Sequence, residues 1–435
     1  MRAISAVVIF LVTYAGIASE RVPRHIVALL GAVLLVTTGV MNLDRAVQFV
    51  SWDTIGLLLG MFILIGVLAD SGFFGYMAAR VARGLRYNPR LVMIVFPILA
   101  AFLSAFMDSI TVTLFLVALS LDLTRILGVD PVPLTVAEIC AANIGGSATL
   151  VGDPPNVILG TLLGYGFSDF LINTGAIALG CLVLTVGYFL AVTWKEYRSF
   201  SPDEIANLKS GFESFEQDNT IGSRRLVGLG LAGLAAAIVL LITHGYIDAR
   251  FHAGISPAIA SLLPALIVLV IGGDEARDVF RKIDGENLLF FISLFMVIGG
   301  LQETGVVSSI ASAVGVVSQG HPRGLIVALN WVSGIASGVV DNVPLALAMG
   351  YVAKDLAAGH FATRLALMTW AIALGVDIGG NLTPVGASAN VVGYTSLEQR
   401  GVKVGWIRWM YYAVPPTLLS LGLSTLVLVL RCRAG

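Results

Sequence analysis

The chain has 435 residues, of which 57% are hydrophobic and 12% are charged, and its mean hydropathy is +0.91. Soluble proteins carry about 25% charged residues, so this composition excludes an ordinary soluble enzyme or binding domain. A formal net charge of -1 excludes a general attraction to nucleic acid. Long apolar runs separated by short polar loops indicate an all-α polytopic membrane protein. The three cysteines are far apart in sequence, which argues against a disulfide framework or a thiolate metal site.

In the first half of the chain, four apolar segments are long enough to cross a bilayer. They lie at 3–19, 24–41, 53–69 and 173–194. Residues 91–127 differ, because a polar centre is flanked by two apolar arms of about 16–18 residues each, which is short for a crossing at 1.5 Å per residue. We therefore predict a re-entrant hairpin over 91–127, with Asp108 at its tip.

The next apolar segment, 134–163, contains the sequence NIGGSATLVGDPPNVIL at 143–159. Three glycines and two prolines at this depth predict one crossing that is broken in the middle. With this broken helix, the first half makes five net crossings. The hydrophilic residues 195–225 then predict a solvated linker that can include a short surface helix.

The second half repeats the first. Residues 143–159 align without a gap with DIGGNLTPVGASANVVG at 377–393, an offset of 234 residues, and the segment around Asp108 aligns with that around Asp341 at an offset of 233. We predict repeats over 1–194 and 226–435. The expected segments of the second repeat are 226–243, 255–272, 285–301, a hairpin at 324–357, a broken helix at 364–395 and a last helix at 410–430.

Five crossings per repeat place the second copy upside down, which is the inverted-repeat design of secondary transporters. Of the 26 Lys and Arg residues, 18 fall on the side of the linker and 8 on the other side. The positive-inside rule assigns the richer side to the cytoplasm. The sequence therefore predicts a multi-pass protein of the plasma (inner) membrane, with a cytoplasmic linker and both termini outside the cytoplasm.

Irregular backbone within a membrane is tolerated where it is buried in protein or lines a watery cavity. Two hairpin tips and two broken helices are expected to meet near the midplane and to form a binding site there. The polar side chains that they would bring together include no Lys, Arg or His. The candidate substrate- and ion-binding residues are Asp108, Ser109, Thr111, Asn143, Ser147, Thr149, Asp153, Asn156, Asp341, Asn342, Asp377, Asn381, Thr383 and Asn390.

An unpaired carboxylate in the membrane costs roughly 2.5–3.5 kcal/mol on insertion scales. Four carboxylates around one site are therefore expected to bind protons or cations. The alternative interpretation is that they cap the half-helices, and the two roles are compatible.

The pattern AxxIGGxATxxGDPPNVI, present at 141–158, and the segment DSGFF at 70–74 resemble the arsenite-efflux (ArsB-type) and melanosomal P-protein branch of the ion transporter superfamily. The resemblance covers essentially the whole chain. It implies a scaffold domain and a mobile transport domain that moves like an elevator. It assigns the site to Asp108, Asn143, Asp153, Asn156, Asp341, Asp377, Thr383 and Asn390. Because GASAN replaces GDPPN in the second repeat, we expect an asymmetric site.

Three transport functions follow as hypotheses. The first is proton-coupled efflux of arsenite or antimonite, because the uncharged trihydroxide suits hydroxyl, amide and backbone groups. The second is a sodium/proton antiporter, or another inorganic-ion carrier of the P-protein type, since carboxylates are hard ligands for Na⁺. The third is a sodium-coupled organic-anion (dicarboxylate) symporter.

No catalytic motif indicates an enzyme, and the sequence calls for no cofactor and no metal site. The expected partners are a small inorganic ion or oxyanion, H⁺ or Na⁺ as the coupling ion, and the lipid bilayer. A partner ATPase is compatible with the sequence, and so are a monomer and a homodimer.

Overall fold

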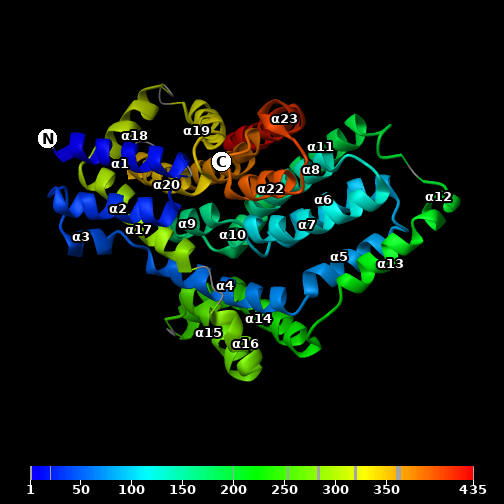
Figure 1. Cartoon of the computed structure of the whole chain (residues 1–435). Helices are drawn as coiled ribbons and strands as arrows, with labels where there is room; N and C mark the ends of the chain where they lie inside the picture. Colours follow the sequence, from blue (N-terminus) through cyan, green and yellow to red (C-terminus); the bar gives the residue numbers. More distant parts are fainter. Residues whose placement is uncertain are drawn as a thin grey trace.

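The computed structural model describes residues 2–19, 21–198, 200–251, 254–281, 285–317, 321–358 and 364–434, and these residues form helices and loops without a β-strand. Figure 1 shows the helices gathered in one body, with the N-terminus at one side. The helices of the first half are α1 (Arg2–Ala18), α2 (Arg24–Thr37), α3 (Leu43–Gln48), α4 (Trp52–Asp70), α5 (Phe73–Gly84), α6 (Pro89–Ser104), α7 (Ser109–Leu127), α8 (Pro131–Gly146), α9 (Pro154–Leu163), α10 (Phe167–Phe170), the π-helix η1 (Leu171–Gly175) and α11 (Ala176–Val192).

Two short helices, α12 (Pro202–Asn207) and α13 (Lys209–Asp218), connect the halves. The second half contains α14 (Arg224–Phe251), α15 (Pro257–Gly272), α16 (Asp274–Arg281), α17 (Gly285–Glu303), α18 (Val306–Val317), α19 (Pro322–Ser337), α20 (Asn342–Ala358), α21 (Leu365–Gly379), the 3-10 helix η3 (Gly380–Leu382), α22 (Ser388–Gln399) and α23 (Gly405–Ala434). The fold is all-α, as the sequence predicts.

The helix starts repeat along the chain. Helices α2, α4, α5, α6 and α7 begin 233 residues before α15, α17, α18, α19 and α20, and α8 and α9 begin 234 residues before α21 and α22. Each half thus has a hairpin, α6–α7 or α19–α20, and an interrupted helix, α8–α9 or α21–α22. In Figure 1 the first hairpin extends to the right of the centre, whereas α20 lies to the left.

Helices of each half pack against helices of the other half. Helix α4 packs against α15 and α14, and its counterpart α17 packs against α2 and α1. Around the site, α6 packs on α8 and α19 on α21, while α9 packs on α20 and α22 on α7. Every one of these pairs has its repeat-related equivalent. The packing therefore follows a pseudo-twofold relation, and helices of one repeat cover helices of the other.

The sequence explains where the helices around the site begin. Asn88 accepts hydrogen bonds from the backbone N–H groups of Arg90 and Leu91, Asp130 accepts one from Val132, and a proline follows each of these caps. Side-chain acceptors and N1 prolines both stabilise helix starts. Gly128, with φ +66, ends α7 in the left-handed conformation that glycine tolerates.

Helices α5 and α18 are elements that the sequence analysis did not predict. Both are 12 residues long and follow a glycine with a positive φ, Gly72 and Gly305. The linker also differs from the solvated segment expected, because α13 packs against α5 and α7. Phe212 and Phe215 are buried there, and the ring of Phe212 stacks on Tyr87 with centroids 3.8 Å apart.

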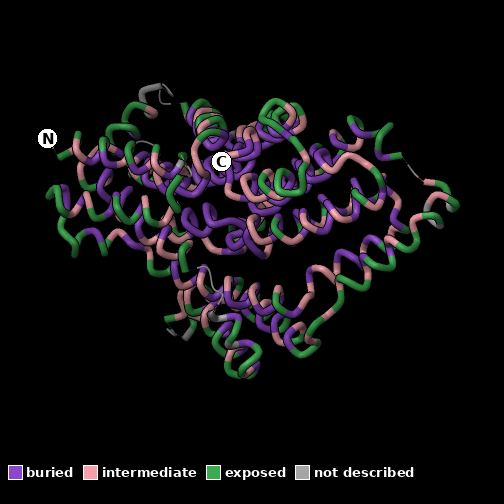
Figure 2. Tube along the Cα trace, in the orientation of Figure 1, coloured by how far each residue is buried: buried purple, intermediate pink, exposed green. Residues whose placement is uncertain are grey.

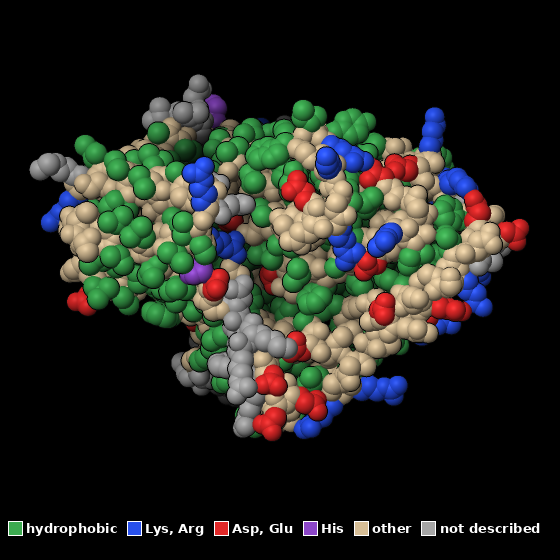
Figure 3. Space-filling model, in the orientation of Figure 1, with side chains coloured by type: hydrophobic (Ala, Val, Ile, Leu, Met, Phe, Trp, Pro, Cys, Tyr) green, Lys and Arg blue, Asp and Glu red, His purple; other side chains and the backbone are tan. Residues whose placement is uncertain are grey.

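Within the described residues, seven helices are long and apolar enough to cross a membrane, judged by length and composition. Figure 2 shows that the buried residues concentrate where α8, α9, α21 and α22 meet, whereas α1, α12 and α13 carry more exposed positions. In Figure 3 much of the left surface is hydrophobic, and many of the visible Lys and Arg side chains lie to the right, near α11–α13. The repeat boundaries and the cytoplasmic side of the linker remain predictions.

Candidate functional site

Glycines allow the interrupted helices to pack against the hairpins without side chains between them. A Cβ atom on Gly145 would lie 2.1 Å from the carbonyl oxygen of Ala101 in α6, and one on Gly379 would lie 2.1 Å from that of Gly334 in α19. Real Cβ atoms do not approach this closely, so the hairpin and the helix break are in backbone contact. The two glycines are related by the repeat, which explains why the IGG motif occurs twice.

An asparagine closes each helix break. Asn156 Nδ2 donates to the carbonyl oxygens of Gly146 and Thr149, both at 3.0 Å. Asn390 Nδ2 makes the equivalent bonds to Gly380, at 2.8 Å, and to Thr383, at 2.7 Å. Carbonyls freed by a broken helix inside a protein need such donors. Both asparagines are therefore structural as well as candidate binding residues.

Threonines join the breaks to the hairpins. The hydroxyl of Thr149 donates to the carbonyl of Ala105, and that of Thr383 donates to the carbonyl of Gly338. Ser147 is fully buried and donates to Ile144 within its own helix, at 2.7 Å. These hydroxyls are thus committed to backbone carbonyls, which limits what they can offer to a ligand.

The aspartates of the two tips cap the second arms of the hairpins. Asp108 accepts from the backbone N–H of Thr111 at 2.9 Å and from its hydroxyl at 2.7 Å. Asp341 accepts from the backbone N–H of Val343 at 3.0 Å. Capping is therefore one role of both residues.

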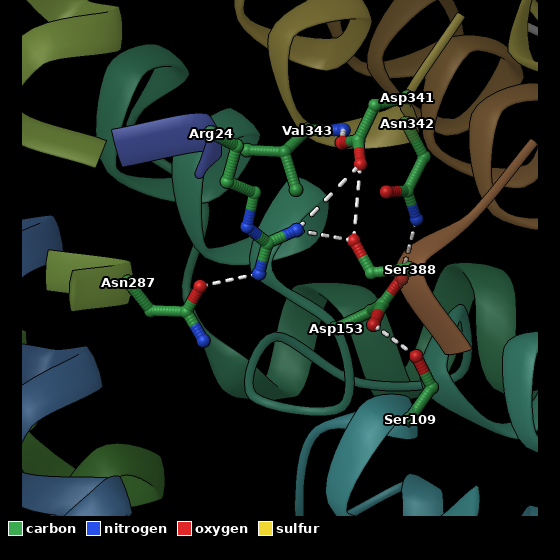
Figure 4. Close-up of polar contacts among 8 residues, drawn as sticks. All are labelled: Arg24, Ser109, Asp153, Asn287, Asp341, Asn342, Val343 and Ser388. Atoms are coloured by element: carbon green, nitrogen blue, oxygen red, sulfur yellow. Dashed lines mark hydrogen bonds and ion pairs between the residues drawn. The ribbon is translucent and has the colours of Figure 1, made fainter. Parts of the chain in front are cut away.

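Asp153 connects the two repeats. One of its carboxylate oxygens accepts from the hydroxyl of Ser109, at 2.7 Å, and the other accepts from Nδ2 of Asn342, at 2.9 Å (Figure 4). Ser109 begins α7 and Asn342 begins α20, so each hairpin contributes one donor. Asp153 itself is 2% exposed. A single buried carboxylate therefore joins both tips and the first helix break.

A second buried carboxylate, Asp377, lies at the end of α21. It is 0% exposed, and neither of its oxygens has a hydrogen-bond partner among the described residues. It lies within electrostatic reach of Asp153, with Asn156 beside it. The Oδ1 atoms of Asn143 and Asn156 are also buried without a partner in the described part of the chain. The unsatisfied side-chain atoms of these three residues are thus all hydrogen-bond acceptors.

The repeat-related position of Asp377 is Asn143, whose amide faces the second break. Its Nδ2 donates to Oδ1 of Asn381 at 2.8 Å and to Oδ1 of Asn390 at 3.0 Å. The side chain of Asn143 thus links α8 to the residues around η3. The structure brings predicted residues of both breaks together. The asymmetry expected from the sequence lies at Asp153, whose repeat-related position is Ala387. The amide of Asn143 opposite the carboxylate of Asp377 is a second asymmetry, which was not predicted.

One cation contacts a hairpin tip, contrary to the expectation that no Lys, Arg or His would lie among these side chains. Arg24, at the start of α2, donates to Ser388 Oγ and to Asn287 Oδ1, and its guanidinium lies 3.8 Å from Asp341 (Figure 4). The sequence places Arg24 at the start of the apolar segment 24–41 and gives it no role in the site. The only signal was its place at the edge of an apolar segment, because the contacts themselves join residues more than 260 positions apart.

A cavity of about 570 Å³ opens beside this arginine. Its walls are mainly apolar, and its polar residues include Arg24, Asp341 and Ser388 at the second tip. At the first tip, a smaller cavity of about 290 Å³ contains Asp70, Asp108 and Asn287. The repeat-related position of Arg24 is Pro257, so the two tips differ in charge.

The comparisons with known proteins agree with this architecture. Residues 14–375 match the family described as citrate transporter. The chain belongs to the citrate transporter family. It is 32% identical over 431 residues to a 46 kDa membrane protein of Mycobacterium leprae, with 98% of each chain covered. It is also 33% identical over 438 residues to an uncharacterized transporter of Mycobacterium tuberculosis, again with 98% of each chain covered.

The human P protein is 27% identical over 482 residues, which cover 94% of this chain and 57% of that protein. Among solved structures, the Neisseria gonorrhoeae antimetabolite efflux pump MtrF gives a TM-score of 0.58 at 13% identity and covers 91% of this chain and 84% of that one. The Alcanivorax borkumensis YdaH transporter gives 0.55 at 14% identity, with 87% and 85% covered. The family match places the chain among multi-pass secondary transporters, and the two solved structures share its fold.

Proposed function

We propose that this member of the citrate transporter family is a proton-coupled secondary transporter, in which Asp153 and Asp377 take up and release the coupling proton. The observation that carries the proposal is the unsatisfied, fully buried carboxyl group of Asp377 beside Asp153. Two carboxyl groups in one buried site cannot both be ionised without a large free-energy cost. The state in which they share one proton therefore has the lower free energy. Proton binding at this pair would change the charge of the site during each transport cycle.

The position of Asp153 supports a link between protonation and movement. Its two oxygens accept hydrogen bonds from both hairpin tips, so each tip is tied to the charge of this carboxyl group. Protonation would leave fewer acceptor sites for Ser109 and Asn342 and weaken the charge-assisted bonds. We propose that this change releases a transport domain, formed by the two hairpins and the two interrupted helices, for an elevator-like movement against the remaining helices.

For the substrate we propose arsenite or antimonite, exported from the cell. The inner site offers amide, hydroxyl and carboxylate groups from Asn143, Ser109, Asn342 and the two aspartates, which suit a small uncharged trihydroxide. This choice places the chain on the arsenite-efflux and P-protein branch of its superfamily.

A second candidate is an organic anion. Arg24 and Ser388 line the cavity of about 570 Å³ and offer a guanidinium and a hydroxyl group, the donors that hold carboxylates. The match to the citrate transporter family also favours this candidate. Sodium is the alternative coupling ion or antiported ion, because the unsatisfied oxygens of Asn143, Asn156 and Asp377 are hard ligands.

We place the protein in the plasma (inner) membrane, with the linker in the cytoplasm and both termini outside. The side-chain distribution supports this orientation, because many of the visible Lys and Arg side chains lie near α11–α13 (Figure 3). We propose that it functions as a monomer or a homodimer, and a partner ATPase is compatible with this proposal.

Purified protein in liposomes would test these proposals. A pH gradient is imposed, and the uptake of radiolabelled arsenite, citrate and sodium is measured in separate samples while a trapped dye reports proton movement. We expect arsenite uptake that is coupled to opposite proton movement. Uptake of citrate alone would select the organic-anion candidate, and sodium uptake alone would select the antiporter. Solute uptake without any proton movement would refute proton coupling.

A further inference from the structure

Glu138 is a buried carboxyl group outside the site described so far. It lies in the middle of α8 and is 1% exposed. One of its oxygens accepts from the hydroxyl of Ser120 in α7, and the other has no hydrogen-bond partner among the described residues. Burying a carboxyl group with one donor costs stability, because its ionised form needs several. This cost calls for an explanation.

The second repeat shows that the fold does not require this pair. The positions related to Ser120 and Glu138 by the repeat are Ala353 and Ile372, which are both fully buried. The contact between α20 and α21 is therefore apolar where that between α7 and α8 is polar. A buried polar pair present in one repeat, and replaced by alanine and isoleucine in the other, points to a function rather than to packing.

The surroundings of Glu138 form a polar line along α8. Tyr197 donates its hydroxyl to the carbonyl of Asp130, at the linker end of α8, and its oxygen also interacts with the backbone of Leu134 one turn further on. Glu138 follows after another turn, so these three positions lie on one face of the helix. At 1.5 Å per residue, Glu138 lies about 12 Å from Asp130 along the axis and about 8 Å from Asn143.

The inner end of this line reaches the candidate site. Asn381 donates to the carbonyl of Cys140 at 3.5 Å and accepts from Asn143 at 2.8 Å. Glu138 is thus midway between the linker end of the bundle and the amides next to Asp377. No comparable carboxyl group stands on α21 at the repeat-related position, which is Ile372.

Titratable and charged groups stand on most helices that pack against α8. They include Arg90 in α6, Asp122 and Arg125 in α7, Tyr188 in α11, Asp377 in α21, Tyr394 and Glu398 in α22, and Arg408, Tyr411, Tyr412 and Arg431 in α23, with Glu196 and Tyr197 beside the linker end of α8. Arg408 forms an ion pair with Asp130 at the linker end of α8. Within the described residues, no Lys, Arg or His forms an ion pair with Glu138. Its carboxylate is therefore expected to be neutralised by binding a proton.

We propose that Glu138 is a proton-transfer residue that connects the linker face of the molecule to the Asp153–Asp377 pair. This inference rests on the proposed proton coupling. During export, the aspartate pair gives its proton to the ionised Glu138 carboxylate, which becomes the neutral acid. Glu138 then releases the same proton to the water at the linker face and returns to the ionised form. One positive charge moves from the aspartate pair to the linker face, and no bond other than O–H is made or broken.

Two variants separate proton transfer from packing. Glu138→Gln keeps the shape and an acceptor for Ser120 but cannot carry a proton. The double variant Ser120→Ala, Glu138→Ile reproduces the pair that the second repeat tolerates. In the liposome assay with arsenite, citrate and sodium as separate probes, we expect both variants to lose most of their proton movement and the pH dependence of transport. Exchange of labelled for unlabelled solute at equal pH on both sides should continue in both.

Infrared spectroscopy of the purified full chain provides a readout that needs no substrate. We expect a carboxylic-acid band that disappears as the buffer pH is raised and is missing in Glu138→Gln, and a separate band that is missing in Asp377→Asn. If Glu138→Gln keeps the wild-type spectrum, proton flux and pH profile, the inference is refuted while the proposed function stands. If the wild type moves no protons with any probe, the proposed proton coupling is refuted. An infrared band that still depends on Glu138 would then show that this residue titrates but has no role in transport.

Discussion

Asp377 differs from the other carboxyl groups of the site, because Asp108 and Asp341 cap hairpin arms and Asp153 accepts two side-chain donors. Asp377 has no such partner in the described residues, so replacing it by asparagine removes a charge and leaves the capping and donor hydrogen bonds of the other three carboxyl groups in place. We expect Asp377→Asn to abolish proton-coupled uptake in liposomes. Its amount in the membrane and its thermal stability should equal or exceed those of the wild type. Coupled transport at the wild-type rate would remove Asp377 from the proposed mechanism.

Asn342 tests the link between the second hairpin and Asp153. Its amide donates to the carboxylate at 2.9 Å, and hydrogen bonds to charged groups contribute about 1.5–3 kcal/mol. Asn342→Ala should therefore lower the transport rate, measured at a limiting proton gradient, by roughly ten- to a hundredfold. The bond from Ser109 remains in this variant, so residual activity is expected. A rate equal to that of wild type would show that the second tip does not sense Asp153.

At the scale of single elements, the helix breaks depend on glycines at positions that have no room for a side chain. A Cβ on Gly152 would lie 2.4 Å from the carbonyl oxygen of Gly146 and 2.7 Å from that of Ser104. Gly152→Ala must displace backbone on both sides, and overpacking of this kind costs about 1–3 kcal/mol. We expect a lower thermal unfolding temperature in detergent and loss of transport. Gly187→Ala, in open space on α11, is the matched control and should be neutral or slightly stabilising.

The linker helix α13 is held to α5 by its aromatic residues. Phe212 is buried and stacks on Tyr87, so Phe212→Ala should loosen α13 at a cost approaching the 3–5 kcal/mol of a core phenylalanine. Limited proteolysis at glutamate residues should then cut the segment 195–225 faster than in wild type. Lys209→Ala, which removes only an exposed pair with Glu213, should leave the cleavage rate unchanged. Equal cleavage of both variants would show that the stack does not anchor the linker.

The sequence predicts hairpins and breaks well, because their signals are local: polar residues at a tip, and glycine and proline within an apolar run. It also predicts most side chains that meet at the site, since the repeat identifies the corresponding positions. It does not predict α5 and α18, which are short and lie between spans. Arg24 and Glu138 were missed for another reason. Their meaning depends on contacts with Asp341 and Ser120, which only the tertiary structure reveals.

At the scale of the whole molecule, Arg24 connects the helices α2 and α17 to the second hairpin tip and α22. Elevator-like movement would have to break its contacts with Asp341 and Ser388. Arg24→Gln should therefore shift the molecule toward conformations in which the cavity beside Val385 is open. We expect a cysteine placed at Val385 to react several-fold faster with a maleimide when Arg24 is replaced.

Arg45→Gln is the control for this experiment, because Arg45 is paired with Glu303 at 2.9 Å and, in the part of the chain that the structure describes, has no hydrogen bond or ion pair with a hairpin tip. The native cysteines Cys140, Cys181 and Cys432 are buried and should label slowly. Identical reaction rates in the two arginine variants would argue that Arg24 does not hold the tip in place.

The exchange of partners between the halves has a consequence for how the protein is made. Helix α4 ends at Asp70, but α15, on which it packs, begins at Pro257. At about 5–20 residues per second, the roughly 190 intervening residues take about 10–40 s to synthesise. During that interval α4 has left the ribosome with one face uncovered, so the nascent first half must wait in the lipid, or beside the insertion machinery, until its later half arrives.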